Sequence, residues 1–266
     1  MENNTMGRVH SVESFALVDG PGVRYAIFLA GCRMRCQYCH NPDTWNPQGG
    51  QLTSVDDLLK KALRFKPYWK KEGGITVSGG EPLLQIEFVT ELFKKAKEKG
   101  VSTVIDTAGQ PFTREEPFLS KFNELMKYTD LVLLDIKEID PARHKTITGF
   151  DNSNILNMAR YLDEIGKPVW IRHVLVPERS DFDEDLDALG AFIATLHNVQ
   201  RVEVLPYHTL GTFKWENLGI PYQLEGIRPP TKERIANAEE RLGCRKAAPA
   251  AEGGDPKLTD RQFRGC

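Results

Sequence analysis

The sequence lacks a long hydrophobic run and a net charge of either sign, and each absence excludes a class of protein. No apolar stretch approaches the roughly 18 to 20 residues that a membrane-spanning helix needs, so we expect no membrane association. Residues 1–9 are mostly polar and no hydrophobic segment follows them, which argues against a secretory signal and for a cytoplasmic location. Lys and Arg number 35 and Asp and Glu 37, a formal net charge of -2. General nucleic-acid binding requires a strongly basic surface, so we expect no nucleic-acid partner.

Cysteine is also scarce, with five residues in 266, which excludes a disulfide-stabilised miniprotein. With 40% hydrophobic and 27% charged residues, the composition is that of a globular protein of one or two domains. Three of the five cysteines, Cys32, Cys36 and Cys39, fall within one short segment. That spacing is too tight for a disulfide framework, and in a reducing compartment clustered cysteines more often bind metal. We expect Cys244 and Cys266, which lack such spacing, to be incidental free thiols.

Short β-branched runs alternate along the chain with longer stretches of helical spacing. The predicted strands are residues 24–29, 75–77, 101–106, 131–136, 169–174 and 202–205. The predicted helices are residues 55–65, 86–99, 115–127, 155–165, 183–197 and 231–242. Six βα units predict an α/β fold with a parallel sheet, either open and doubly wound or a partial barrel. We assign residues 1–242 to this domain and the low-complexity residues 243–266 to a flexible C-terminal tail.

Three residues mark expected helix ends. Ser54 precedes a predicted helix as a candidate N-cap, because its hydroxyl can accept a hydrogen bond from a free backbone N–H group. Gly100 and Gly166 follow predicted helices at the position where a left-handed backbone conformation ends a helix.

In parallel α/β folds, functional groups gather in the loops after the carboxyl ends of the strands. Here those loops carry the three cysteines and the turn Ser78-Gly79-Gly80-Glu81-Pro82. Further reactive or charged residues end the other predicted strands: Asp106, Thr107, Asp135, Lys137, Arg172, His173 and His208. We therefore expect all of these residues to lie on one rim of the fold.

Three thiolates in one short loop suit a soft metal centre. An iron–sulfur cube held by three cysteines is one protein ligand short, and its unfilled iron is open to a substrate, as the open position is in catalytic zinc sites. The alternative is a structural zinc ion with His40 as its fourth ligand. Cys39 and His40 are adjacent, however, which is poor geometry for two ligands of one ion, and the chain has no second Cys-x2-Cys pair. We therefore favour the cluster.

The Cys-x3-Cys-x2-Cys motif, with Tyr38 before its last cysteine, resembles that of the radical S-adenosylmethionine (SAM) enzymes. Other motifs extend the resemblance to about Leu242 and narrow it to the enzymes that activate glycyl radical enzymes: Asp19-Gly20-Pro21-Gly22, Tyr38-Cys39-His40-Asn41, Ser78-Gly79-Gly80-Glu81-Pro82, Leu133-Leu134-Asp135-Ile136-Lys137 and Leu205-Pro206-Tyr207-His208.

The resemblance implies a radical SAM fold, a partial (β/α)6 TIM-like barrel of parallel strands. It also implies an oxidoreductase with one [4Fe–4S] cluster on Cys32, Cys36 and Cys39, whose fourth iron is chelated by SAM. One-electron reduction would cleave SAM to a 5′-deoxyadenosyl radical, which removes a hydrogen atom from a backbone glycine of the partner enzyme.

The same resemblance assigns roles to individual residues. Asp19 joins the three cysteines as a catalytic residue, because it would accept hydrogen bonds from the partner's glycine loop. Glu81 would offer its carboxylate to the amino group of SAM. The residues assigned to SAM binding are Tyr38, Cys39, His40, Gly79, Gly80, Glu81, Asp135, Ile136, Lys137, Arg172 and His208. Those assigned to a monovalent cation beside the SAM carboxylate are Asp106, Thr107 and Asp135, with the Leu133 carbonyl.

Each of these residues also has a plain structural interpretation. The paired glycines could form a tight turn, and the carboxylates could cap helices or form ion pairs. Arg172 is equally a salt-bridge partner inside the barrel or a substrate contact. We expect the lysine-rich stretches 66–71 and 94–99 to be solvated faces, with docking of an acidic electron donor as the alternative.

The region after the cysteine motif helps to identify the protein substrate. Many activases of other glycyl radical enzymes carry a cysteine-rich, ferredoxin-like insert there, whereas residues 41–76 contain no cysteine. The resemblance therefore implies pyruvate formate-lyase as the protein substrate, under anaerobic conditions, with reduced flavodoxin or ferredoxin as the electron donor and a monomeric enzyme. The alternatives are a radical SAM enzyme acting on a different glycyl radical enzyme or a small molecule, and a zinc-stabilised binding module.

Overall fold

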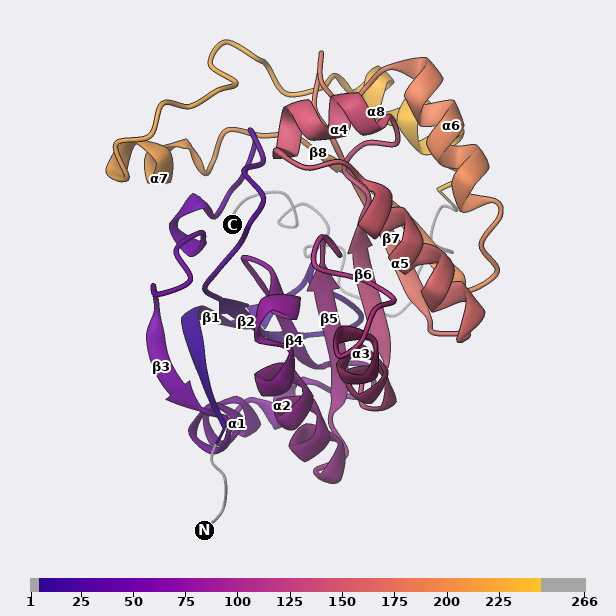
Figure 1. The fold of residues 1–266 in the computed structure, drawn as a ribbon. Coiled ribbons are helices and arrows are strands. Elements are labelled where there is room, and N and C mark those ends of the chain that lie inside the picture. Colours follow the sequence, from indigo (N-terminus) through magenta and orange to yellow (C-terminus); the bar gives the residue numbers. More distant parts are fainter. Residues whose placement is uncertain (1–4, 245–266) are drawn as a thin grey trace.

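The computed structural model describes residues 5–244, which form an eight-stranded curved sheet with helices on its outer side (Figure 1). The strand order is β3-β1-β2-β4-β5-β6-β7-β8, a linear order in which the described strands do not close into a full barrel. Six strands run parallel to one another: β2 (Arg24–Leu29), β4 (Gly74–Gly79), β5 (Ser102–Thr107), β6 (Leu131–Asp135), β7 (Val169–Leu175) and β8 (Val199–Pro206). The predicted partial barrel of six parallel strands is confirmed.

Two strands were not predicted from the sequence, β1 (Met6–Ala16) and β3 (Gln51–Ser54). β1 pairs antiparallel with both β2 and β3 and so extends the sheet beyond its parallel part. Most residues of β1 are partly or fully exposed, and its sequence contains Gly, Arg, His, Ser and Glu, so it shows no β-branched run. Pairing with the free edge of β2, rather than local pattern, makes this segment a strand.

The six predicted helices are present, with ends that differ by a few residues: α1 (Val55–Leu63), α2 (Ile86–Glu98), α3 (Phe118–Lys127), α5 (Ser153–Glu164), α6 (Asp183–Ile193) and α8 (Lys232–Arg241). The Ser54 hydroxyl accepts a hydrogen bond from the Asp57 N–H group (3.1 Å), which confirms Ser54 as the N-cap of α1. Gly100 and Gly166 have φ angles of 64° and 63°, which confirms both as left-handed residues after helices. The predicted start of α3 at residue 115 is wrong, because Pro117 disfavours helical geometry at the residue before it.

Two short helices were not predicted, α4 (Pro141–Thr148) and α7 (Thr212–Asn217). α4 has no apolar stripe that a periodicity would reveal, since it buries only His144, Ile147 and Thr148. Its ends nevertheless carry signals: the Asp140 side chain accepts a hydrogen bond from the Arg143 N–H group (2.7 Å), and Gly149 ends the helix at φ 88°.

The main core lies between the sheet and the helices. β4 buries five of its six residues and β6 four of its five, as expected of strands covered on both faces. Ile75 and Val77 from β4 and Leu92 and Phe93 from α2 are fully buried in this core. The burial fixes the register of the parallel strands and therefore places all their carboxyl ends at one rim.

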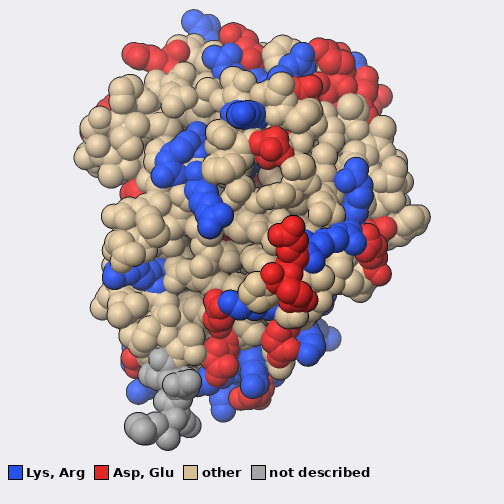
Figure 2. Space-filling view, viewed as in Figure 1, with Lys and Arg blue, Asp and Glu red and all other residues tan. Residues whose placement is uncertain are grey.

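The surface matches the balanced composition. Figure 2 shows basic and acidic side chains intermixed at both ends of the displayed face. Among residues 5–244, no helix combines the length and the apolar character needed to span a bilayer. Gly243 and Cys244, assigned above to the tail, complete the end of α8, where the Cys244 N–H group donates to the Glu239 carbonyl (2.9 Å). The rest of the predicted tail, including Cys266, lies outside the described residues.

Candidate active site

The three clustered cysteines lie in the loop that follows β2. Cys36 is buried, Cys32 and Cys39 are half-buried, and all three are free thiols. The backbone N–H groups of Arg35 and Gln37 donate to carbonyls in the last turn of α4, at 2.8 and 2.9 Å. The unpredicted helix α4 thus anchors the cysteine loop.

The surroundings of the cysteines are apolar. Burial raises the pKa of Cys32 and of Cys36 to about 12 and also raises the pKa of Cys39. Protein groups alone therefore keep these thiols neutral, whereas a cationic metal centre would favour the thiolates. The buried side chains packed around the cysteines come from several loops and helices: Met34, Tyr38, Ile147, Val176, Tyr207 and Leu224.

The donor set fits a cluster better than a single zinc ion. Across residues 5–244, no three His, Cys, Asp or Glu side chains converge on a point where one ion would bind. His40, the candidate fourth zinc ligand, directs its Nε2 atom to the His208 carbonyl (3.1 Å), and its ring stacks on the His208 ring at 4.0 Å. Burial and His208 lower the pKa of His40 to about 4, so the ring is neutral at pH 7. With His40 turned to the His208 carbonyl, the donors left in this loop are three thiols, the donor type of a cluster in which each thiolate binds a different iron.

Two tryptophans that the sequence analysis did not single out flank the last cysteine. The Trp45 indole hydrogen-bonds the Cys39 side chain, and Trp215 Nε1 donates to the Cys39 carbonyl (2.9 Å). The two rings meet edge to face at 5.1 Å, and the Arg35 guanidinium lies 4.7 Å above Trp45. Trp45 follows the cysteine motif closely in sequence, whereas nothing local connects Trp215 with Cys39.

The turn after β4 packs directly on the cysteine loop. The Gly80 N–H group donates to the Leu29 carbonyl (2.9 Å) and the Glu81 N–H group to the Gly31 carbonyl (2.7 Å). A Cβ atom on Gly79 would lie 2.2 Å from the Leu29 nitrogen, and one on Gly80 2.2 Å from the Gly31 oxygen. Both glycines are therefore required by the approach of the two loops, whatever ligand they also meet.

Glu81 is almost fully buried and its carboxylate already has three donors from the chain. Oε1 accepts from the Leu83 N–H group (3.0 Å) and the Thr107 hydroxyl (2.6 Å), and Oε2 accepts from the Ala108 N–H group (3.1 Å). Burial raises its pKa to about 7, against the effect of these hydrogen bonds. The carboxylate thus ties the turn after β4 to the end of β5. The hydroxyl of Thr107, a residue assigned above to a cation, donates its hydrogen bond to Glu81.

A buried ion pair lies at the ends of β5 and β7. Asp106 Oδ2 accepts a hydrogen bond from the Ser78 hydroxyl (2.7 Å) and forms an ion pair with Arg172 (3.2 Å). Arg172 also lies 3.7 Å from Glu203. Burial raises the pKa of Asp106 and Arg172 lowers it. The structure therefore places Arg172 in a salt bridge inside the barrel.

The end of β6 supplies a second pair. Lys137 Nζ donates to Asp135 (3.1 Å) and lies 5.7 Å from the centre of the Tyr38 ring. Although burial lowers the pKa of Lys137, Asp135 and Tyr38 raise it well above its usual value, so the ammonium is charged. Ile136, between the pair, is fully buried in the main core, as is Leu133 in a smaller cluster.

Asp19 reaches this network from the loop between β1 and β2. Arg172 donates to the Val18 carbonyl (3.5 Å), and the Thr76 hydroxyl donates to the Asp19 carbonyl (2.7 Å). Burial and the nearby Asp106 raise the pKa of Asp19 to about 6. The structure thus brings Asp19 and Asp106 together, although 87 positions separate them in sequence.

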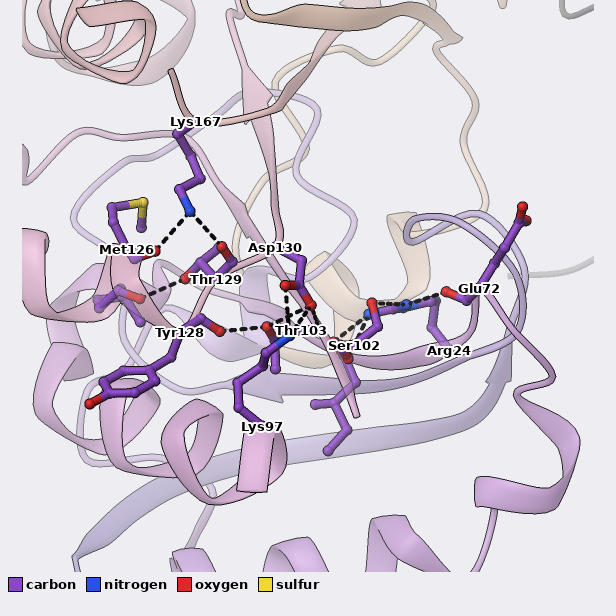
Figure 3. Close-up of polar contacts among 12 residues, drawn as sticks. Arg24, Glu72, Lys97, Ser102, Thr103, Met126, Tyr128, Thr129, Asp130 and Lys167 are labelled. Carbon is purple, nitrogen blue, oxygen red and sulfur yellow. Dashed lines mark hydrogen bonds and ion pairs between the residues drawn. The ribbon is translucent and has the colours of Figure 1, made fainter. Parts of the chain in front are cut away.

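Arg24 supports the same loop, and the sequence analysis missed it. Its guanidinium is fully buried and donates to neutral oxygens only, among them Thr76 Oγ1 (2.9 Å) and the Glu72 carbonyl (3.0 Å). It also donates to the Pro21 carbonyl (3.4 Å). Its bonds to Ser102 are drawn in Figure 3. Its place within a predicted strand gave no sign of this role.

Comparison with known proteins shows the family of the chain. A sequence model described as the Radical SAM superfamily matches residues 26–189. Pyruvate formate-lyase-activating enzyme from Streptococcus mutans is 58% identical over 88% of this chain and 90% of its own length. The protein of the same name from Listeria monocytogenes is 50% identical over 89% of this chain and 96% of its own length.

Solved structures share the fold at low identity. Streptococcus suis SuiB bound to its precursor peptide SuiA superposes with a TM-score of 0.62 at 18% identity, covering 88% of this chain and 48% of SuiB. A domain of pyruvate-formate lyase-activating enzyme from Bacteroides vulgatus superposes with a TM-score of 0.53 at 24% identity, covering 64% of this chain and 93% of the domain. With the cysteine loop at the barrel rim and relatives of at least 50% identity along most of their length, the chain belongs to the pyruvate formate-lyase-activating enzyme family of the radical SAM superfamily, which uses SAM and a [4Fe–4S] cluster.

Proposed function

We propose that this protein activates pyruvate formate-lyase anaerobically by generating a glycyl radical on it. The observation that carries the proposal is the direct packing of the Gly79–Glu81 turn on the cysteine loop, within hydrogen-bond distance at Gly31. That packing brings a three-thiol centre and a turn suited to a small ligand to the same part of the rim. The relatives named above supply the identity of the protein substrate.

Cys32, Cys36 and Cys39 would hold the cluster, leaving one iron without a protein ligand. When bound and reduced, the cluster supplies the electron that cleaves SAM, and the resulting 5′-deoxyadenosyl radical takes a hydrogen atom from the partner's glycine. The apolar residues packed around the thiols shield part of this centre from water. Trp45 and Trp215 fix Cys39 by their indole N–H groups, one bonded to its side chain and the other to its carbonyl.

The chain's charged residues would hold SAM beside the cluster. The charged, nearly buried Lys137 ammonium offers a donor for the SAM carboxylate or ribose hydroxyls. We assign the other contacts to the rim residues predicted from the sequence: Tyr38, His40, Gly79, Gly80, Glu81, Asp135, Ile136, Arg172 and His208. Because three chain donors already occupy the Glu81 carboxylate, only Oε2, which has one of them, has capacity for a further donor.

A monovalent cation is a further part of the proposal. Asp106 Oδ1 is buried and accepts no hydrogen bond from residues 5–244, so one hard oxygen at the end of β5 has capacity for a cation. Asp135 and the Leu133 carbonyl follow on the neighbouring strand. Thr107 would contribute its hydroxyl lone pair while its proton stays on Glu81.

Asp19 would accept hydrogen bonds from the partner's glycine loop. Its loop touches Arg172 at one end and Arg24 at the other, which fixes the carboxylate at the inner wall of the barrel. We further propose reduced flavodoxin or ferredoxin as the electron donor, a monomer as the active species and the cytoplasm as its location. The free thiols among the described cysteines support a reducing compartment.

The test is an anaerobic assay of the reconstituted protein with SAM, a reductant and pyruvate formate-lyase, read by electron paramagnetic resonance. We expect about four irons per chain and a glycyl radical on the partner. Cys36→Ala should form no 5′-deoxyadenosine, whereas Cys244→Ala, a free thiol outside the loop, should behave as wild type. Stoichiometric zinc without iron would contradict the proposal. A glycyl radical formed only on a different glycyl radical enzyme would show that this other enzyme, and not pyruvate formate-lyase, is the protein substrate.

A further inference from the structure

A cavity of about 350 Å³ lies outside the candidate active site, next to the starts of β4 and β5. Its wall contains four lysines, Lys66, Lys70, Lys71 and Lys97, and one acidic residue, Asp130. This is the region where the two lysine-rich stretches of the sequence meet. Because parallel strands share a direction, the cavity and the cysteine loop lie at opposite ends of the barrel.

Two of the four lysines are engaged by the chain itself. Lys97 Nζ pairs with Asp130 at 2.7 Å, as Figure 3 shows, and Lys66 Nζ donates to the Lys99 carbonyl at 2.6 Å. Within residues 5–244, the ammonium groups of Lys70 and Lys71 take part in no hydrogen bond or ion pair. The cavity wall therefore carries two cations that no carboxylate neutralises.

The floor of the cavity adds positive charge from inside the protein. Ser102 lines the cavity, and both its hydroxyl and its carbonyl accept hydrogen bonds from Arg24 at 3.2 Å. Arg24 is 0% exposed, and all its hydrogen-bond acceptors are neutral oxygens. The guanidinium has no bonded carboxylate, and although Asp130 and Asp19 lie near enough to interact with its charge, it adds a cation behind this wall.

Two further features mark the cavity wall as unusual. Trp69 is 3% exposed, and its indole Nε1 has no acceptor among the described residues. Lys70 has a φ angle of 50°, a left-handed backbone conformation that is uncommon outside glycine and recurs at ligand-binding positions. The cavity wall thus combines a buried N–H donor, a lysine in a left-handed conformation and two ammonium groups without a bonded carboxylate.

We propose that this cavity binds a small phosphorylated anion, held mainly by Lys70 and Lys71. Ammonium groups bind phosphate as mobile point charges, and a cavity of about 350 Å³ suits a ligand the size of a nucleoside monophosphate or smaller. The alternative from the sequence, an acidic electron-donor protein, is disfavoured by position. The six residues of β4 span roughly 20 Å, so a donor docked here would face the wrong end of the barrel.

Occupancy of the cavity should also act on the Asp19 loop, a part of the inference that rests on the proposed function. Gly73 lines the cavity, and a Cβ atom on Gly22 would lie 2.6 Å from its backbone nitrogen, so the two segments touch. Arg24 bridges the same segments, because it donates to both the Glu72 and the Pro21 carbonyls. An anion that orders Lys70 and Lys71 therefore stiffens the loop that carries Asp19.

Binding is tested on the full chain by titration with pyrophosphate and, separately, with AMP, followed by calorimetry and tryptophan fluorescence. We expect saturable one-to-one binding that weakens about tenfold or more in Lys70→Ala/Lys71→Ala. The matched control is Lys60→Ala/Lys61→Ala, a lysine pair lining a cavity of about 340 Å³ on α1, which should retain binding within about twofold. Trp69→Phe should remove the fluorescence change. Tighter binding of AMP would identify a nucleotide ligand, and equal binding would identify the phosphate group alone.

No saturable binding of either probe at millimolar concentration, or an equal loss in both lysine variants, would overturn the site. Coupling is tested by hydrogen exchange of residues 17–23, which should slow severalfold when pyrophosphate is bound. Unchanged exchange despite binding would overturn the coupling. None of these measurements needs the cluster or the partner enzyme. They therefore test the anion site even if the proposed function is wrong.

Discussion

At the carboxyl rim, buried charges pair with one another, whereas at the amino end the buried charge of Arg24 is surrounded by neutral oxygens. The rim pairs, Arg172 with Asp106 and Lys137 with Asp135, still leave polar atoms unpartnered, including Asp106 Oδ1 and Tyr38 Oη. At the amino end, every nitrogen of the Arg24 guanidinium donates a hydrogen bond. Unmet polar atoms suit a region that receives a ligand, whereas the saturated guanidinium of Arg24 suits a residue that holds strands together.

The amino-end network extends beyond Arg24. Lys167 Nζ donates to the carbonyls of Met126 and Thr129 at 2.8 and 2.7 Å, and the Thr103 hydroxyl donates to the Tyr128 carbonyl at 2.5 Å (Figure 3). These bonds tie the end of α3 to the starts of β5, β6 and β7. The buried pairs of the rim therefore serve chemistry and the Arg24 network serves stability, and four experiments test this difference.

The largest effect on stability should come from Arg24→Met. The substitution leaves several buried oxygens without a donor, and we expect the free energy of unfolding to fall by about 4 kcal/mol. Arg8→Met is the control, since Arg8 is only partly buried and its guanidinium donates to one carbonyl, that of Gln48. It should cost less than about 1 kcal/mol. Urea denaturation measures both, and equal losses would contradict the view that Arg24 organises this end.

Asp106→Asn and Asp130→Asn should separate activity from stability. Asp106→Asn removes the charge that orients Arg172 and should slow 5′-deoxyadenosine formation about 100-fold, or about 2.7 kcal/mol. Asp130→Asn weakens a bond from the Thr103 N–H group and should lower the free energy of unfolding by about 1 kcal/mol. Its rate of 5′-deoxyadenosine formation should match wild type. An equal loss of rate in Asp130→Asn and Asp106→Asn would contradict the view that only the rim end of the barrel serves chemistry.

Glu138, which follows β6 at the rim, should make stability depend on pH. It is 1% exposed, burial raises its pKa to about 7, and Oε2 has no donor from residues 5–244. The folded state thus holds a proton that the unfolded state releases near pH 4.5, so this contribution is greatest at low pH and is lost as the pH rises toward 7.

Glu138→Gln should remove that dependence. Between pH 5 and pH 8, the free energy of unfolding of wild type should fall relative to Glu138→Gln by about 2 kcal/mol. Denaturation of both proteins at several pH values measures the difference. Parallel pH profiles would mean that water reaches the carboxylate.

The smallest effect should come from Trp45→Phe. Loss of the indole hydrogen bond to Cys39 removes stabilisation of the more negative, reduced cluster, and the reduction potential should fall by about 40 mV, equivalent to about 1 kcal/mol. Trp69→Phe at the amino end is the matched control and should leave the potential unchanged. A redox titration followed by electron paramagnetic resonance measures both variants.

The sequence predicts the repeating units because burial on both faces dictates their composition. The run Leu131–Leu134 can only be an interior strand, and the stripe of Leu58, Leu59 and Ala62 can only face a core. β1 and α4 were missed because neither has such a pattern. β1 exists by pairing with β2, and α4 is marked by its capping residues rather than by an apolar face.

The site divides in the same way. Motif spacing places the functional groups on one rim, but not their partners. The register between parallel strands decides that Glu81 bonds Thr107 and that Gly80 packs against Gly31. Trp215 bonds Cys39 across 176 positions, and no local pattern encodes such a contact.

The anchoring of the cysteine loop on α4 sets an order of assembly. The two carbonyls that hold the loop belong to Ile147 and Thr148, more than one hundred residues after the cysteines. A nascent chain that has not yet folded through β6 and α4 therefore presents three thiols without the contacts that arrange them. Insertion of the metal centre into an arranged loop therefore follows the folding of more than half the barrel.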